Sequence, residues 1–92
     1  MQPKTTHHAR ARLRQRGIAP QTLQLLLQFG RRSYDHRGGC VLSLDHAGRE
    51  RAMQAAGPAA AQLNLNVFAV LDTSMQHVVT VGHRTRRVKE NA

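Results

Sequence analysis

Two stretches near the end of the chain decide the fold: Leu65-Asn66-Val67-Phe68-Ala69-Val70-Leu71-Asp72, and then His77-Val78-Val79-Thr80-Val81-Gly82-His83-Arg84-Thr85-Arg86-Arg87. In the second stretch Val79 and Val81 flank Thr80, and such alternation is typical of a strand with one buried face. Asp72-Thr73-Ser74 between the two stretches favours a turn. We therefore predict a closing hairpin whose last strand ends in a run of basic side chains.

A second hairpin is predicted upstream, with strands over 31–36 and 40–44 joined by the turn-forming pair Gly38-Gly39. Asp45 can then cap a polar, Ala-rich helix over 46–56, which the pair Gly57-Pro58 ends. This helix has one large apolar residue, so it is expected to lie on the surface.

Two helices are expected before the first hairpin. The first begins after a capping Thr5 or Thr6 and runs to about Arg16, where Gly17 stops it. The second spans 20–29, with proline in its favoured first position, Leu23, Leu26 and Leu27 on one side, and Gly30 as its C-terminal stop.

The order of these elements predicts an α+β fold: two N-terminal helices, then a four-stranded, mostly antiparallel sheet with one inserted surface helix. The helices would pack on one face of the sheet and leave the other face free to carry function. We expect a single domain over 1–92, with an ordered core over about 6–88 and loose termini.

The chain is strongly basic, with 14 Lys+Arg against 5 Asp+Glu and a formal charge of +9. Such a charge attracts nucleic acid or another polyanion. Twelve of these cations are arginine, which a GC-rich genome also favours, but codon bias does not explain why they cluster. Only Phe29, Tyr34 and Phe68 are aromatic, so phosphate and shape contacts are expected rather than stacking on bases.

The single Cys40 excludes an intramolecular disulfide and agrees with a reducing compartment. No apolar run approaches the roughly 20 residues of a membrane span, and no signal peptide is visible. We expect a cytoplasmic monomer or homodimer without a membrane partner.

Three groups of residues are candidates for chemistry. His8, Arg12 and Arg16 recur at four-residue spacing and form one helical stripe, which could follow phosphates or simply face solvent. The segment from Tyr34 to Gly39, with Arg37, carries more polar side chains than a hairpin turn requires, so function and turn formation are both open.

The third group is on the closing strand and comprises Thr80, His83, Arg84, Arg86 and Arg87. Alternation places His83 with Val81, toward the helices or at the rim, unless Gly82 marks a bulge that resets the pattern. A plain basic tail is the alternative.

Other sites have less support. Cys40 with His36, or His77 with His83, does not match a zinc spacing. Residues 10–29 imitate a helix-turn-helix, but the second helix lacks basic residues. No phosphate-binding glycine loop is present, and no metal or cofactor is expected.

The segments His8-Ala-Arg-Ala-Arg-Leu-Arg-Gln-Arg-Gly-Ile18, Tyr34 to Gly39, and Val79-Thr-Val-Gly-His-Arg84 together resemble an uncharacterised bacterial domain family. That family is grouped with the small ribonuclease fold of barnase, EndoU, colicins and RelE-like proteins. The resemblance covers about residues 7–88. It implies a cleft on the sheet surface to which the first helix and the last strand contribute residues. The chain departs from the family pattern by the insertion from Asp45 to Leu63.

By this resemblance, His8 matches the early histidine of the family, and Thr80, His83 and Arg84 match its closing strand. The first functional hypothesis is therefore a metal-independent, toxin-like or translation-regulating RNA endonuclease. His83 or His8 would move protons, Thr80 would hold a phosphate oxygen, and Arg84 with other arginines would stabilise the phosphate.

Two alternatives stay open. The chain could be a non-catalytic RNA- or ribosome-binding module of the same fold, with Arg12, Arg16, Arg37, Arg86 and Arg87 as nucleic-acid-binding residues. It could also be a basic interaction domain for an acidic, antitoxin-like protein. The first hypothesis needs intact histidines, the second only arginines, and the third no nucleic acid.

Overall fold

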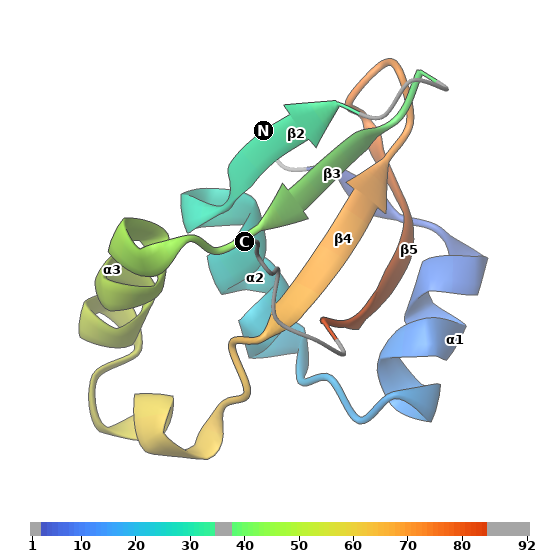
Figure 1. Ribbon diagram of the computed structural model, residues 1–92. Coiled ribbons are helices and arrows are strands. Elements are labelled where there is room, and N and C mark those ends of the chain that lie inside the picture. Colours follow the sequence, from blue (N-terminus) through green and yellow to red (C-terminus); the bar gives the residue numbers. More distant parts are fainter. Residues whose placement is uncertain (1–2, 35–37, 85–92) are drawn as a thin grey trace.

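The computed structural model describes residues 3–34 and 38–84. Five strands form one sheet in the order β1-β5-β4-β3-β2, as Figure 1 shows for its four longer strands. These strands are β1 (Lys4–Thr5), β2 (Arg31–Tyr34), β3 (Cys40–Ser43), β4 (Val67–Leu71) and β5 (His77–His83). The expected α+β class is confirmed, but the sheet is five-stranded and mixed because β1 runs parallel to β5. The remaining neighbours are antiparallel, as expected.

The additional strand β1 precedes the first helix and was not predicted. The backbone N–H of Lys4 donates to Gln76 O at 2.8 Å, and that of Thr6 donates to Val78 O at 3.1 Å. A strand of two residues is too short to show an alternating pattern. It forms because the chain entering the first helix runs along the free edge of β5.

Helix α1 (His7–Gln15) begins and ends as the sequence predicts. The Thr6 hydroxyl accepts a hydrogen bond from Ala9 N at 3.1 Å, which caps the first turn. Gly17 ends the helix with a φ of +65°, and its N–H donates to Arg14 O. Helix α1 packs against β5 and therefore stands beside the edge of the sheet.

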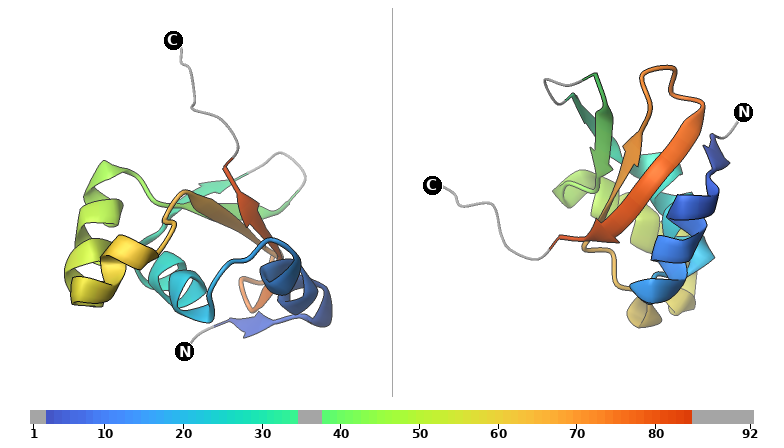
Figure 2. Two further views of the ribbon diagram at one scale, coloured as in Figure 1. Left: turned by 90° about the horizontal axis from the view of Figure 1, so that it is seen from below. Right: turned by 90° about the vertical axis from the view of Figure 1, so that its right-hand side faces the viewer.

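Helix α2 (Pro20–Phe29) packs across β3 and β4 on the same side of the sheet as α1, as Figure 2 shows. Proline occupies its first turn and Gly30 follows its last residue, as expected. It supplies three buried side chains to the core, Leu23, Leu25 and Leu26. Leu25 was not expected on the buried side, and Leu27, which was, is only partly buried.

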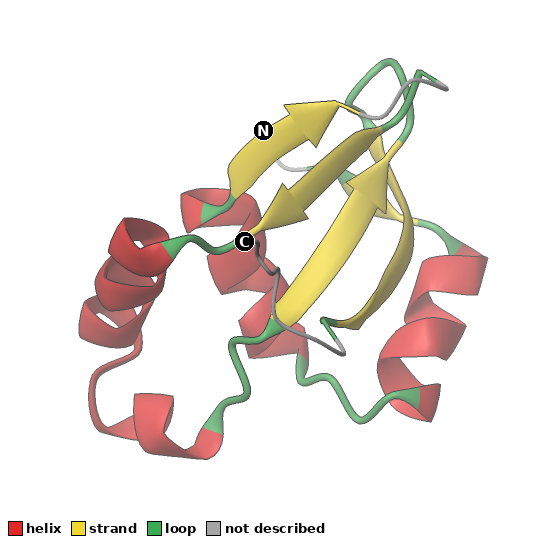
Figure 3. Ribbon diagram, in the orientation of Figure 1, coloured by secondary structure: helices red, strands yellow, loops and turns green. Residues whose placement is uncertain are grey.

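The insertion forms helix α3 (His46–Ala56) and a 3-10 helix, η1 (Gly57–Gln62). The Asp45 carboxylate caps α3 by accepting from Gly48 N at 2.7 Å, which confirms the predicted start. A Cβ on Gly48 would lie 2.7 Å from Phe29 O, so α3 approaches α2 closely. The inserted helix thus extends the helical side of the molecule (Figure 3).

The helical side of the sheet carries the core. Its buried strand residues are Cys40, Leu42, Val67, Ala69, Leu71, Val78 and Val81. No described helix covers the opposite surface, which we call the open face (Figure 2). None of the described helices is long and apolar enough to cross a membrane.

A bulge interrupts β5. Val70 pairs with Thr80, but the next residue, Leu71, pairs with Val78, so Val79 is the extra residue. The sequence pattern allowed for a bulge at Gly82, not at Val79. The bulge at Val79 instead sets the two faces of β5: Val78, Val81 and His83 are on the helical side, whereas His77, Thr80 and Gly82 are on the opposite side.

Candidate functional site

The open face consists of two complete rows of side chains that cross four strands. One row is Arg31, Ser43, Phe68 and Gly82. The other row is Ser33, Val41, Val70 and Thr80. Small polar and β-branched side chains dominate both rows, and Phe68 is the only aromatic residue in them.

Phe68 is the central feature of this surface. A Cβ on Gly82 would lie 2.9 Å from Phe68 Cζ, so the ring lies directly over the glycine of the neighbouring strand. Phe68 is half-buried and does not belong to the hydrophobic core. Because glycine at position 82 has no side chain, the Phe68 ring can lie against the backbone there. A larger residue at this position would displace the ring.

Cationic residues border the open face. Arg31 lies at its β2 edge and contacts the Asp45 carboxylate at 3.6 Å while remaining largely exposed. Arg84 directly follows β5, and its N–H donates to Asn66 O at 2.9 Å, so pairing continues past the end of the strand. Alternation from His83 then places the Arg84 side chain toward the open face. Lys4 lies at the opposite edge, beside His77.

Two of the predicted site residues, Thr80 and Arg84, thus belong to the open face. Thr80 is half-buried in the second row, opposite Val70. They are neighbours of Phe68 through the β4–β5 ladder. The sequence identified both from the closing strand but did not link them to an aromatic ring.

His83 lies on the helical side instead, where both of its ring nitrogens have partners. Nε2 is 2.7 Å from Arg16 O, and Nδ1 is 3.5 Å from Asn64 Nδ2. A carbonyl oxygen only accepts, so Nε2 carries the hydrogen and Nδ1 accepts from the amide. The ring thereby joins the end of β5 to the C-terminal end of α1.

His8 lies at the other end of α1. Its Nε2 accepts from Arg12 Nε at 3.4 Å. Eight residues separate His8 from Arg16, which is roughly 12 Å along the helix axis. His8 and His83 therefore lie at opposite ends of one helix and share no contact.

The predicted nucleic-acid-binding residues fall into two sets. Arg12 and Arg16 belong to α1, and Arg12 also donates to Gln15 Oε1 at 3.5 Å. The expected contact of His8 with Arg12 is present. It belongs to α1, which lies in the helical layer rather than on the open face (Figure 2). Arg37, Arg86 and Arg87 lie outside the described residues, as do Asp35 and His36 of the predicted turn.

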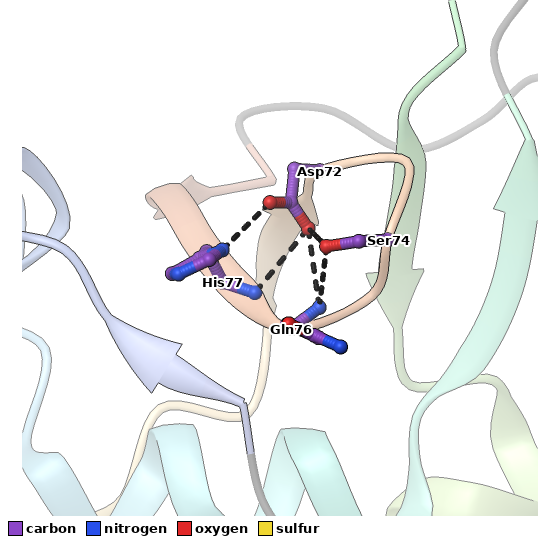
Figure 4. A network of polar contacts seen from close by, with 4 residues as sticks. All are labelled: Asp72, Ser74, Gln76 and His77. Carbon is purple, nitrogen blue, oxygen red and sulfur yellow. Dashed lines mark hydrogen bonds and ion pairs between the residues drawn. The ribbon is translucent and has the colours of Figure 1, made fainter.

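The sequence did not identify a compact polar network at the turn between β4 and β5 (Figure 4). Asp72 Oδ1 accepts from Ser74 Oγ at 2.9 Å, from Gln76 N at 3.1 Å and from His77 N at 3.3 Å. Asp72 Oδ2 lies 2.7 Å from His77 Nδ1. The sequence feature that could have predicted this network is an Asp and a His on either side of the predicted turn, because a hairpin turn brings the residues that flank it together.

The hydrogen bond from the His77 side chain is the main reason why the pKa of Asp72 falls from 3.8 to about 2. Desolvation is the second largest effect and raises this pKa, while the Ser74 hydroxyl and the backbone N–H groups of His77 and Gln76 each lower it by less. The carboxylate is therefore ionised throughout the neutral range.

No group of three or more metal-ligating side chains occurs within residues 3–34 and 38–84. Cys40 is buried on the helical side. A hollow of about 530 Å³ opens between α2 and the ends of the strands, with Leu27, Leu42 and Arg32 in its lining. It too is on the helical side, away from Thr80 and Arg84.

Comparison of the chain with models of protein families, with curated proteins and with solved structures gave no match. The resemblance to the small ribonuclease fold therefore stays a prediction. Function has to be argued from the surfaces of the molecule itself.

Proposed function

We propose that the protein is an RNA-binding module that holds single-stranded RNA on the open face of its sheet. The observation that carries this proposal is the Phe68 ring, which lies over Gly82 outside the core. An aromatic ring on a cation-bordered sheet is a surface on which a base can stack. Here the arrangement supports stacking, which the low aromatic content of the sequence did not lead us to expect.

Charge supports the same proposal. Lys4, Arg31 and Arg84 border the open face, and the whole chain carries a formal charge of +9. A phosphate backbone running past Phe68 would meet cations at both edges of the sheet. The nuclease hypothesis built on His8 and His83 stays a prediction, but it has less support because these residues lie at opposite ends of α1.

The test compares Phe68→Leu with Tyr34→Leu by fluorescence anisotropy on a labelled single-stranded RNA. Leucine still covers Gly82 but offers no face for stacking, so we expect roughly 5- to 100-fold weaker binding. Tyr34 is 67% exposed and lies on the helical side of β2, so its substitution should leave the affinity unchanged. Equal losses in the two variants, or none in Phe68→Leu, would contradict the proposal.

A second arm separates RNA from an acidic protein partner. Binding should weaken with salt, with a log–log slope of about −0.7 for each phosphate contacted, and Arg31→Gln should reduce that slope. Poly-glutamate of similar length should bind far more weakly because it has no bases. Equal binding of poly-glutamate would favour the acidic protein partner instead.

A further inference from the structure

We propose that His77, held by Asp72 and next to Lys4, is a proton-transfer site that acts on the 2′-hydroxyl of RNA bound to the open face. This inference rests on the proposed RNA binding and goes beyond it, because it assigns a reaction and a catalytic residue. It also differs from the histidines that the sequence suggested.

The place of this site in the sheet is the first argument. Leu71 and Val78 pair with each other and are buried on the helical side. The next residues, Asp72 and His77, project from the opposite side, since side chains alternate along a strand. They continue the open face beyond its two complete rows. Asp72 lies four residues after Phe68, which is about 13 Å along the direction of β4.

The two oxygens of Asp72 have different partners. Oδ1 alone braces the turn, through its bonds from Ser74, Gln76 and the His77 backbone. Oδ2 instead meets the His77 ring at 2.7 Å, as Figure 4 shows. A turn brace requires only the first set, so the contact to the ring needs its own explanation. The low pKa of Asp72 keeps this partner anionic.

The contact fixes the chemistry of the ring. A carboxylate only accepts, so the hydrogen of the neutral ring is on Nδ1 and the lone pair is on Nε2. No hydrogen bond to Nε2 occurs within residues 3–34 and 38–84, and the side chain is 45% exposed. An imidazole oriented by a carboxylate with its other nitrogen open to solvent has the arrangement of a general base.

A cationic residue is the strand partner of His77. Lys4 on β1 is the register partner of His77 in the parallel pair, so its side chain leaves the same face of the sheet. Lys4 is exposed, and its N–H bond to Gln76 O anchors the strand that carries it. An ammonium group at this edge can stabilise the phosphate next to the 2′-hydroxyl.

The step balances without a further reagent. His77 Nε2 takes the proton of the 2′-hydroxyl, O2′ bonds to the adjacent phosphorus, and the bond from phosphorus to O5′ breaks. The leaving O5′ takes a proton from water, and His77 returns its proton to solvent, so none is gained overall. The products are a 2′,3′-cyclic phosphate and a 5′-hydroxyl.

The experiment follows cleavage of an end-labelled single-stranded RNA by the full chain in EDTA, beside DNA of the same sequence. His77→Ala should lower the rate about 100-fold or more without changing the RNA affinity. Added imidazole should restore activity to this variant, which a purely structural loss would not allow. Asp72→Asn should lower kcat while leaving KM unchanged, because Asp72 is a positioning residue.

One control variant and three possible outcomes make the experiment decisive. His46→Ala changes an exposed histidine of α3 that pairs with Glu50 at 3.3 Å, and it should be fully active. RNA binding without cleavage by the unmodified protein would overturn this inference and leave the proposed function intact, whereas absence of binding would overturn the proposed function. Cleavage that depends on His8 or His83 but not on His77 would also overturn it.

Discussion

The two faces of β5 carry similar kinds of residue, but those on the helical side are buried or bonded and those on the open face are accessible. On the helical side Val78 and Val81 are buried, and both ring nitrogens of His83 have partners in other elements. On the open face Thr80 stays half-exposed, and His77 has a partner only on Nδ1 within the described chain. The difference shows that a histidine in a basic strand is a candidate for chemistry only when one ring nitrogen remains accessible.

The largest difference between the faces should appear in stability. Val78→Ala removes a fully buried side chain and should lower the free energy of unfolding by about 2 kcal/mol. Thr80→Ala, two residues along the strand, should stay within about 0.5 kcal/mol. Urea unfolding followed by circular dichroism measures both. Equal losses would mean that the open face is covered in solution.

The two histidines provide a matched pair. His83→Ala removes the ring that joins β5 to the end of α1 and should cost about 1 kcal/mol, or roughly 4–8 °C in Tm. His77→Ala leaves the core untouched and should shift stability by less than about half as much. Thermal melts at one pH check this prediction. A larger loss in His77→Ala would show that the edge of the sheet depends on the Asp72 contact.

The smallest expected effect is the pH dependence of stability that Asp72 contributes. Its pKa is lowered to about 2 in the fold from an ordinary value of 3.8, so the folded state binds the proton less readily than the unfolded state. The resulting stabilisation is present above about pH 4 and disappears as the pH falls toward 2. The Tm gap between the unmodified protein and Asp72→Asn should therefore narrow over that range. A constant gap would contradict the lowered pKa.

Local signals in the sequence predicted most elements correctly. Thr6, Gly17, Gly30 and Asp45 bound the helices as expected, because capping and positive φ depend on one or two residues. Alternation also placed His83 with Val81 on the side of the helices. The bulge at Val79 was missed, since a bulge depends on the register with β4 rather than on β5 alone.

The candidate site was less predictable. Thr80 and Arg84 stood out from the closing strand, and both reach the open face. The contact of Phe68 with Gly82 was not visible, because the two residues meet only through strand pairing. His8 and His83 were grouped by motif, but the length of α1 keeps them apart.

The sequence by itself determined the helices, the two hairpins and the basic character, because caps, turns, alternation and charge are properties of neighbouring residues or of the whole composition. Tertiary structure alone decided that β1 joins the sheet beside β5, that Phe68 lies over Gly82 on an uncovered face, and that Asp72 holds His77. These features depend on register between strands. A shift of one residue would turn each side chain to the other face, so no local pattern could specify them.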